Sequence, residues 1–138
     1  MKIMVSACLL GENCKYSGGN NRDERVLAFL KGNEVIPVCP EVMGGLPTPR
    51  LPAEIVEGVV VNRAGVSVDR EYRLGAQKAL EIAQREKIDL AILQSRSPSC
   101  GVKEIYDGTF TGTRIPGQGI CAALLAKNGF ALLDREDV

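Results

Sequence analysis

Short apolar runs alternate with amphipathic stretches along the chain, which predicts strands alternating with helices. Residues 2–7 (KIMVSA) and 88–95 (IDLAILQS) are mostly apolar, as expected for strands that are buried on both faces of a parallel sheet. Residues 34–39 (EVIPVC) predict another short strand, in which Pro37 favours a strand end or a sheet edge. Residues 130–134 (FALLD) predict the last strand.

Three stretches space their apolar residues as helices do. Residues 70–87 predict the longest helix, with Asp69 as its N-cap and charged residues on the face opposite its apolar stripe. That stripe consists of Leu74, Ala76, Ala79, Leu80 and Ala83. Residues 22–31 predict a shorter helix, and residues 120–128 predict a third that ends at Gly129.

The remaining segments predict a hairpin and two loops. Residues 53–69 contain two short strands joined by a turn at Asn62–Gly65. The glycine- and proline-rich stretch from Pro40 and the polar residues 96–119 predict loops. This order of elements predicts a single-domain, Rossmann-like three-layer α/β fold with a mainly parallel sheet plus a β-hairpin. Residues 1–138 contain neither an internal repeat nor a linker, so one domain is expected.

Composition narrows the class of protein. The 138 residues are 45% hydrophobic and 25% charged, as in folded soluble proteins. Lys plus Arg is 17 and Asp plus Glu is 17, whereas proteins that bind long nucleic acids or membrane surfaces usually carry a basic excess. The apolar runs are too short to span a bilayer, and the amino terminus is a poor signal peptide. We therefore expect a cytoplasmic protein with no membrane or long nucleic-acid partner, and the sequence carries no signal of its oligomeric state.

The chain has no histidine, which excludes Ser-His-Asp hydrolysis, Cys-His protease chemistry and histidine-based zinc sites formed within it. It has five cysteines, an odd number in a compartment expected to be reducing, so a disulfide framework is not expected. There is no CxxC pair, so neither a zinc ribbon nor a thioredoxin-type redox site is indicated. The cysteines are therefore inert core thiols, a reactive thiolate or metal ligands.

Three cysteines follow predicted strands. Cys8, Cys39 and Cys100 come at the carboxyl ends of strands that are predicted to be parallel, and each has a glycine or proline within three positions. Because such strand ends meet at one edge of the sheet, where ligands bind, we expect the three thiols to face one crevice. Cys121 lies in an apolar helix and is interpreted as a core residue. Cys14 remains open as a ligand, a reactive thiol or a bystander.

Four strings together give a specific resemblance that extends over essentially the whole chain. They are SACLLGENCKYSGGN (6–20), PVCPEVMGGLPTPR (37–50), LQSRSPSCG (93–101) and GTFTGTRIPGQGICAALL (108–125). In this order they resemble the thiouracil desulfurase family, long known only as a bacterial domain of unknown function. The resemblance implies a [4Fe–4S] cluster held by only three cysteines, Cys8, Cys39 and Cys100, with a fourth iron left open.

The resemblance also implies a reaction. It is the non-redox desulfuration of a small thiolated nucleobase, 2-thiouracil to uracil with release of hydrogen sulfide, in which the open iron takes the sulfur of the substrate. Glu41 in CPE and Ser97 or Ser99 in SPSC match the family's catalytic positions, with Ser97 favoured. A carboxylate there would act as general base and acid. A serine hydroxyl would relay the proton or bind the substrate carbonyl.

Other interpretations stay open. An iron–sulfur or metal carrier or redox sensor would use the same thiols and would hold a cluster without turnover, and a fourth ligand at Cys14 would favour it. A metal-free enzyme would use Cys39 alone as nucleophile. Glu41 is alternatively a helix-capping residue or the ion-pair partner of Arg50, and the serines are alternatively turn formers.

Three weaker features point to the same site. Tyr16 and Tyr106 would stack on a nucleobase or simply pack. The amino terminus of the helix at 120–128, which follows Gly117 and Gly119, is a further candidate to face the site.

Overall fold

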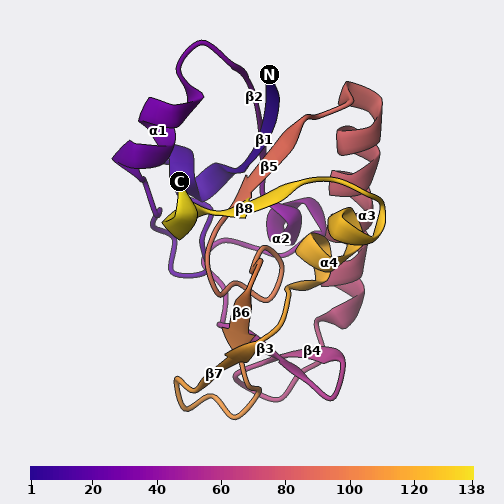
Figure 1. Cartoon of the computed structure of the whole chain (residues 1–138). Coiled ribbons are helices and arrows are strands. Elements are labelled where there is room, and N and C mark those ends of the chain that lie inside the picture. Colours follow the sequence, from indigo (N-terminus) through magenta and orange to yellow (C-terminus); the bar gives the residue numbers. More distant parts are fainter.

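The structure is a computed structural model that describes all residues, 1–138. Four strands form a parallel sheet in the order β2-β1-β5-β8 (Figure 1). They are β1 (Lys2–Ser6), β2 (Glu34–Val38), β5 (Leu90–Leu93) and β8 (Leu132–Asp134). Ile3 of β1 pairs with Val35 on one side and with Leu90 on the other, so β1 lies inside the sheet.

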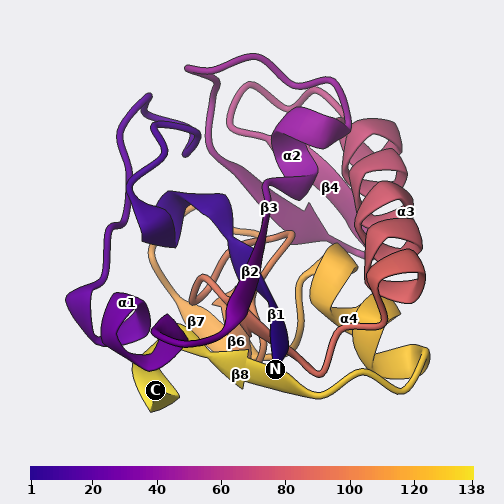
Figure 2. The same cartoon turned by 90° about the horizontal axis from the view of Figure 1, so that it is seen from above.

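Helices cover both faces of this sheet. They are α1 (Glu24–Leu30) on one face, and α3 (Asp69–Glu86) and α4 (Ile120–Lys127) on the other (Figures 1 and 2). Side chains alternate accordingly along β1: Ile3 and Val5 join the core beneath α1, whereas Met4 joins the core beneath α3 and α4. The predicted three-layer α/β fold with a mainly parallel sheet is thus confirmed. None of the helices combines the length and apolarity that crossing a membrane requires.

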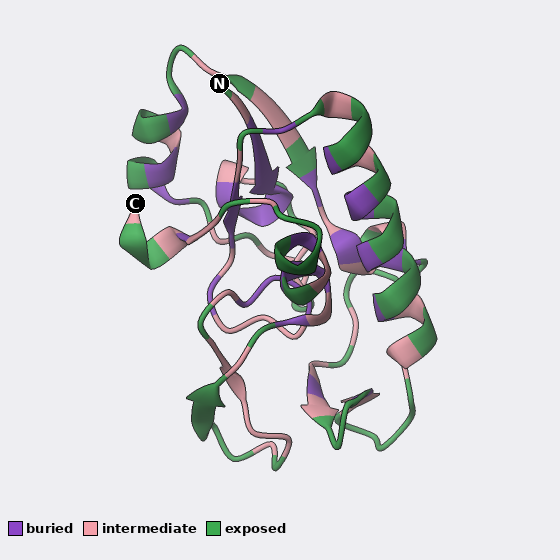
Figure 3. Ribbon diagram, turned by 45° about the vertical axis from the view of Figure 1, so that its right-hand side comes forward, coloured by how far each residue is buried: buried purple, intermediate pink, exposed green.

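The long helix α3 buries a stripe of mostly small side chains, visible as the purple inner face in Figure 3. The stripe consists of Tyr72, Gly75, Ala76, Ala79, Leu80 and Ala83. Two predictions for this helix are wrong. Leu74 is 46% exposed, because it lies outside the stripe. Asp69 is the first helical residue and Val68 the N-cap, since the Asp69 carboxylate instead accepts from the N–H of Val60 (3.0 Å) and from Nε of Arg73 (2.7 Å).

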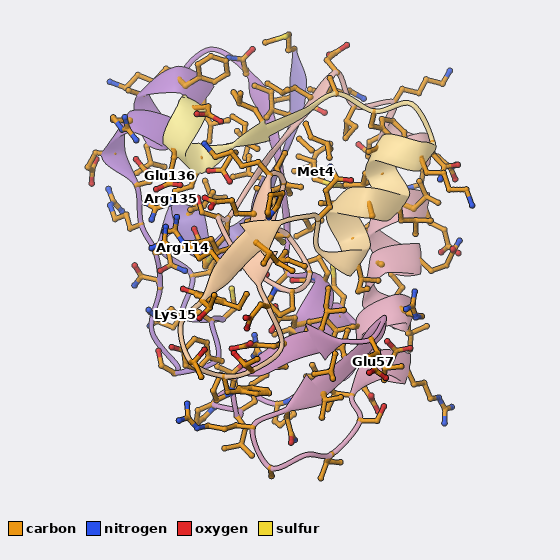
Figure 4. All side chains as sticks on the ribbon, turned by 60° about the horizontal axis from the view of Figure 1, so that its bottom comes forward. Met4, Lys15, Glu57, Arg114, Arg135 and Glu136 are labelled. Atoms are coloured by element: carbon orange, nitrogen blue, oxygen red, sulfur yellow. The ribbon has the colours of Figure 1, made fainter.

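The predicted hairpin exists, but its turn lies elsewhere. Strands β3 (Ala53–Val56) and β4 (Val59–Asn62) are joined by Glu57 and Gly58, at φ of 49° and 80° (Figure 4 labels Glu57). Positive φ at both positions matches the tight hairpin turn that follows the twist of the strands. The turn at Asn62–Gly65 is also present, but it leads only to an isolated bridge between Val61 and Ser67.

Short elements interrupt both predicted loops. The segment after Cys39 begins with a one-turn helix, α2 (Pro40–Met43). The segment 96–119 contains a second antiparallel hairpin, β6 (Glu104–Tyr106) with β7 (Arg114–Pro116). Two 3₁₀ helices, η1 (Ala7–Leu10) and η2 (Arg135–Asp137), follow β1 and β8. Both hairpins lie beyond the carboxyl ends of the central strands (Figure 1), so they add walls to that edge of the sheet.

Candidate functional site

A cavity of about 450 Å³ lies at the carboxyl ends of β1, β2 and β5. The chain runs outward from β1 to β2 on one side and from β5 to β8 on the other, so the strand order reverses between β1 and β5. Ligands of open α/β sheets bind at such reversal points. The volume is within the range of small-molecule sites, and the two hairpins contribute part of the wall.

Four of the five cysteines line this cavity, namely Cys8, Cys14, Cys39 and Cys100. All five are free thiols. Cys121 is fully buried in the core beneath α3 and α4 and does not line the cavity, in agreement with its interpretation as a core residue. The structure therefore brings the three predicted ligands together and places Cys14 beside them.

Each cysteine of the predicted set comes from a separate wall. Cys8 belongs to η1, is 8% exposed, and its sulfur accepts from Nδ2 of Asn21 (3.4 Å). Cys39 is the N-cap of α2, and its thiol lies 3.8 Å from the carbonyl oxygen of Cys14. Cys100 is 4% exposed in the loop after β5.

The thiols differ in acidity for physical reasons. A hydrogen bond from the Cys14 thiol lowers the pKa of Cys39 to about 7, against the opposing effect of burial and with help from the N–H of Val42. The same hydrogen bond, followed by burial, raises the pKa of Cys14. Burial raises the pKa of Cys8 and that of Cys100. Cys39 is thus the thiol that most readily becomes a thiolate.

Two glycines bring α2 into contact with α3. A Cβ atom on Gly75 would overlap the carbonyl oxygen of Pro40, and a Cβ atom on Gly44 would overlap that of Glu71. Any larger residue at either position would therefore push α2 away from α3. Since Cys39 and Glu41 are carried by α2, this close approach sets their position at the cavity.

Glu41 forms a buried ion pair with Arg50. Its Oε1 lies 3.0 Å from Nη2 and 3.1 Å from Nε of the guanidinium, and the two side chains are 14% and 7% exposed. Nη2 of Arg50 also donates to the carbonyl of Cys14 (2.9 Å). The ion pair with Arg50, which was one of the alternative roles considered for Glu41, is thus present. It connects α2 to the loop that contains Cys14.

The second carboxylate oxygen of Glu41 is free for the two serines. Oε2 accepts from Oγ of Ser99 at 2.7 Å and from Oγ of Ser97 at 3.4 Å. Ser97 Oγ in turn accepts the N–H groups of Ser99 (3.1 Å) and Cys100 (3.0 Å), so this serine shapes the turn that presents Cys100. The shorter contact to Glu41 belongs to Ser99, which is 2% exposed.

The amino terminus of α4 does not face the cavity, contrary to expectation. Its first N–H groups donate to the carbonyls of Pro98 and Ser99, at 2.8 to 3.1 Å. A Cβ atom on Gly119 would lie only 2.5 Å from the carbonyl carbon of Ser99. The amino terminus of α4 therefore stabilises the loop that carries Cys100, on the side away from the cavity.

Several residues that line the cavity escaped the sequence analysis. Tyr72 is 2% exposed, and burial, then the neighbouring Glu41 carboxylate, raises its pKa. Glu54 and Phe110 come from the two hairpins. The only signal for Tyr72 was its helical spacing, which indicates a core residue. Phe110 lies in a segment that was predicted to be a loop. Tyr16 and Tyr106, the two tyrosines that the sequence indicated as candidates for stacking, also line the cavity.

Cations lie among the lining residues. They are Lys15 (labelled in Figure 4), Arg63 and Arg96, besides the buried Arg50. Arg96 is paired with Glu136 (3.0 Å).

The thiols of the cavity suit an iron–sulfur cluster better than a single metal ion. No three cysteine, aspartate or glutamate side chains converge as the ligands of one metal ion would. An iron–sulfur cluster instead takes its cysteines on different irons, so the ligands stand around the cofactor. Thiolates from separate walls of one cavity, without histidine, fit that second arrangement.

Comparisons with known proteins agree with this geometry. A family model described as 2-thiouracil desulfurase matches residues 3–137. The solved structure of a [4Fe-4S]-dependent thiouracil desulfidase, TudS, superimposes with a TM-score of 0.93 at 40% identity, covering 99% of this chain and 92% of that one. YbbK of Bacillus subtilis (strain 168), an uncharacterized protein, is 36% identical over 146 residues, covering 99% of this chain and 97% of the relative.

Proposed function

The chain belongs to the 2-thiouracil desulfurase family, and on that premise we propose that it is a [4Fe–4S]-dependent enzyme that desulfurates a small thiolated nucleobase. The overall reaction is 2-thiouracil plus water to uracil plus hydrogen sulfide, with no net change in oxidation state. The observation that carries the proposal is the single cavity in which three thiols from three strand ends meet the Glu41–Ser99 pair.

We assign Cys8, Cys39 and Cys100 as the protein ligands of the cluster. When bound, a cluster with three protein ligands would supply an iron without a protein ligand, a Lewis acid suited to the soft sulfur of a thiocarbonyl. Cys14 is assigned a different role, because its contacts to the site run through its carbonyl oxygen, which accepts from Nη2 of Arg50 and lies 3.8 Å from the Cys39 thiol. Three-cysteine coordination follows from these assignments.

Glu41 and Ser99 are assigned to proton transfer. Replacing C=S by C=O requires a proton to leave the attacking water and protons to reach the departing sulfur. Oε2 of Glu41 is positioned to hold such a proton, and the 2.7 Å contact to Ser99 Oγ offers a relay between that carboxylate and a substrate bound in the cavity, while Cys100 stays an unprotonated ligand. Ser97, whose oxygen accepts two backbone N–H groups, is assigned to holding the loop.

Arg50 is the residue that positions the Glu41 carboxylate toward the serines. By pairing with Oε1 it leaves Oε2 as the only carboxylate oxygen directed to the serines. A free nucleobase fits the cavity volume, which supports a small-molecule substrate. We place the enzyme in the cytoplasm, where thiols stay reduced.

The test is anaerobic reconstitution with iron and sulfide, followed by incubation with 2-thiouracil and measurement of uracil and sulfide. Cys8→Ala, Cys39→Ala and Cys100→Ala are expected to lose cluster absorbance and turnover together. Cys14→Ala and the core control Cys121→Ala are expected to keep the cluster. Glu41→Gln is expected to keep the cluster and to lose about 100-fold or more in kcat.

Two results would contradict the proposal. A stable cluster in the wild type without turnover of any thiolated base would favour a carrier or redox sensor. Loss of the cluster in Cys14→Ala would make that residue a fourth ligand and remove the open iron.

A further inference from the structure

The loop between β6 and β7, residues 107–113, is fixed to β3 by one buried carboxylate. Oε1 of Glu54 accepts the N–H of Gly108 (2.9 Å) and the N–H of Phe110 (3.2 Å), and Glu54 is only 9% exposed. The backbones also touch, because a Cβ atom on Gly108 would lie 2.7 Å from the carbonyl oxygen of Ile55. Two segments far apart in the sequence thus form one wall of the cavity.

Phe110 is held in an unusual conformation by this contact. Its φ is 57°, in the left-handed region that aromatic residues rarely adopt. Such backbone conformations persist only where the surroundings enforce them, and they cluster at functional sites. The hydrogen bond from its own N–H to Glu54 is one such constraint.

The side chain of Phe110 is not used by the hydrophobic core. It belongs to neither of the two core clusters and packs against neither of them, and it is only partly buried. It lines the same cavity as Cys8, Cys39 and Cys100. An aromatic residue in a strained loop that adds nothing to the core, yet lines a cavity, calls for a ligand with a flat face.

We propose that Phe110 is the stacking surface for the planar thiolated heterocycle, and that Glu54 is the positioning residue that fixes it. This inference rests on the proposed function and adds a specificity element to it. Stacking on an aromatic ring tolerates any base that has a π face, whereas it adds little for a small thioamide without a ring. The site therefore discriminates between planar heterocycles and acyclic thioamides through Phe110.

The test compares 2-thiouracil with thioacetamide on reconstituted enzyme. Phe110→Leu raises KM for 2-thiouracil about tenfold, with kcat nearly unchanged, while kcat/KM for thioacetamide stays as in the wild type. Phe110→Tyr keeps the ring and keeps KM. Phe29→Leu is the matched control, because Phe29 is 41% exposed on α1, away from the cavity.

Glu54 is tested through its hydrogen bonds. Glu54→Gln retains an acceptor oxygen and is expected to retain KM, whereas Glu54→Ala raises KM as Phe110→Leu does. The double variant Glu54→Ala/Phe110→Leu is no worse than either single one, because both act through the same ring. A purely structural role for Glu54 would instead lower the melting temperature without changing KM.

Uracil binding to the cluster-loaded protein, measured by saturation-transfer NMR, separates this inference from the proposed function. Phe110→Leu weakens uracil binding about tenfold even if no substrate is turned over. A wild type that binds uracil but desulfurates nothing would contradict the proposed function alone. Unchanged KM and unchanged uracil affinity in Phe110→Leu, or no uracil binding by the wild type, would overturn the stacking role.

Discussion

Oε1 of Glu41 lies 3.0 Å from Nη2 of Arg50, and both side chains are almost completely shielded from solvent. Removing one partner of such a pair leaves a buried charge uncompensated. We expect Arg50→Met to lower the free energy of unfolding by about 3–5 kcal/mol. The double variant Glu41→Gln/Arg50→Met should lose clearly less, and urea unfolding at pH 7 measures both.

An exposed pair provides the control for this prediction. Arg73 and Asp69 are 2.7 Å apart, but their side chains are 54% and 22% exposed. Arg73→Met should therefore cost less than about 1 kcal/mol. An equal loss in Arg50→Met and Arg73→Met would show that burial does not govern the Glu41 pair.

Replacing each of the two serines by alanine should affect a different property of the enzyme. Ser97→Ala leaves the N–H groups of Ser99 and Cys100 without their acceptor, so it should lower the free energy of unfolding by about 1–3 kcal/mol. Ser99→Ala removes the short contact to Glu41 and should mainly lower kcat. Urea unfolding and steady-state kinetics on the two variants distinguish these outcomes; the reverse pattern would exchange the roles assigned to the serines.

Gly75→Ala should destabilise the protein, although alanine normally stabilises a helix interior by about 1 kcal/mol relative to glycine. The added methyl group overlaps the Pro40 carbonyl and displaces α2. We expect a lower melting temperature and loss of cluster loading, because Cys39 moves with α2. Gly19→Ala is the matched control, since the nearest atom to its Cβ would be at an ordinary 3.5 Å. Stabilisation by Gly75→Ala would refute the close approach.

Asp23 should make stability depend on pH. Burial alone would raise its pKa, but the N–H of Val26, the side chain of Arg135 and the N–H of Arg25 together hold the pKa below its usual range. A depressed folded-state pKa contributes stability that is present above the unfolded-state pKa of about 4 and is lost as pH falls through the folded-state value.

Asp23→Asn keeps a capping oxygen but loses the charge. We expect it to cost about 1–2 kcal/mol at pH 7 and progressively less as the pH falls below about 4. Urea unfolding at several pH values measures the difference. If the difference in free energy of unfolding between the wild type and Asp23→Asn grew as the pH falls, the pKa of Asp23 would be raised and not lowered in the folded protein.

The sequence predicted the parts of the fold that repeat a pattern over many residues. The continuous apolar runs of β1 and β5 and the spacing in α3 follow from burial alone, and so does the meeting of three strand-end cysteines. The β6–β7 hairpin was missed because its strands have three residues each and β7 is exposed. The β3–β4 turn was misplaced because Asn62–Gly65 carries the stronger local turn signal, whereas pairing across the hairpin selects Glu57 and Gly58.

The site was predictable only as far as topology determines it. The contacts of Glu41 with Arg50 and Ser99 connect three segments whose relative orientation no local pattern encodes. Phe110 gave no signal because its importance rests on a backbone conformation enforced by Glu54, a residue of another hairpin. The α4 terminus was misjudged because its N–H groups are already satisfied by the Cys100 loop.

The placement of Cys8, Cys39 and Cys100 on separate strand ends also orders events during synthesis. At about 5–20 residues per second, the ribosome adds Cys100 several seconds after Cys39. A nascent chain therefore exposes two thiols of the centre before the third exists and before β5 can pair beside β1. If the proposed assignment holds, a cluster that needs all three thiols can be acquired only after translation has passed Cys100. The first two thiols would then have to stay reduced before iron is needed.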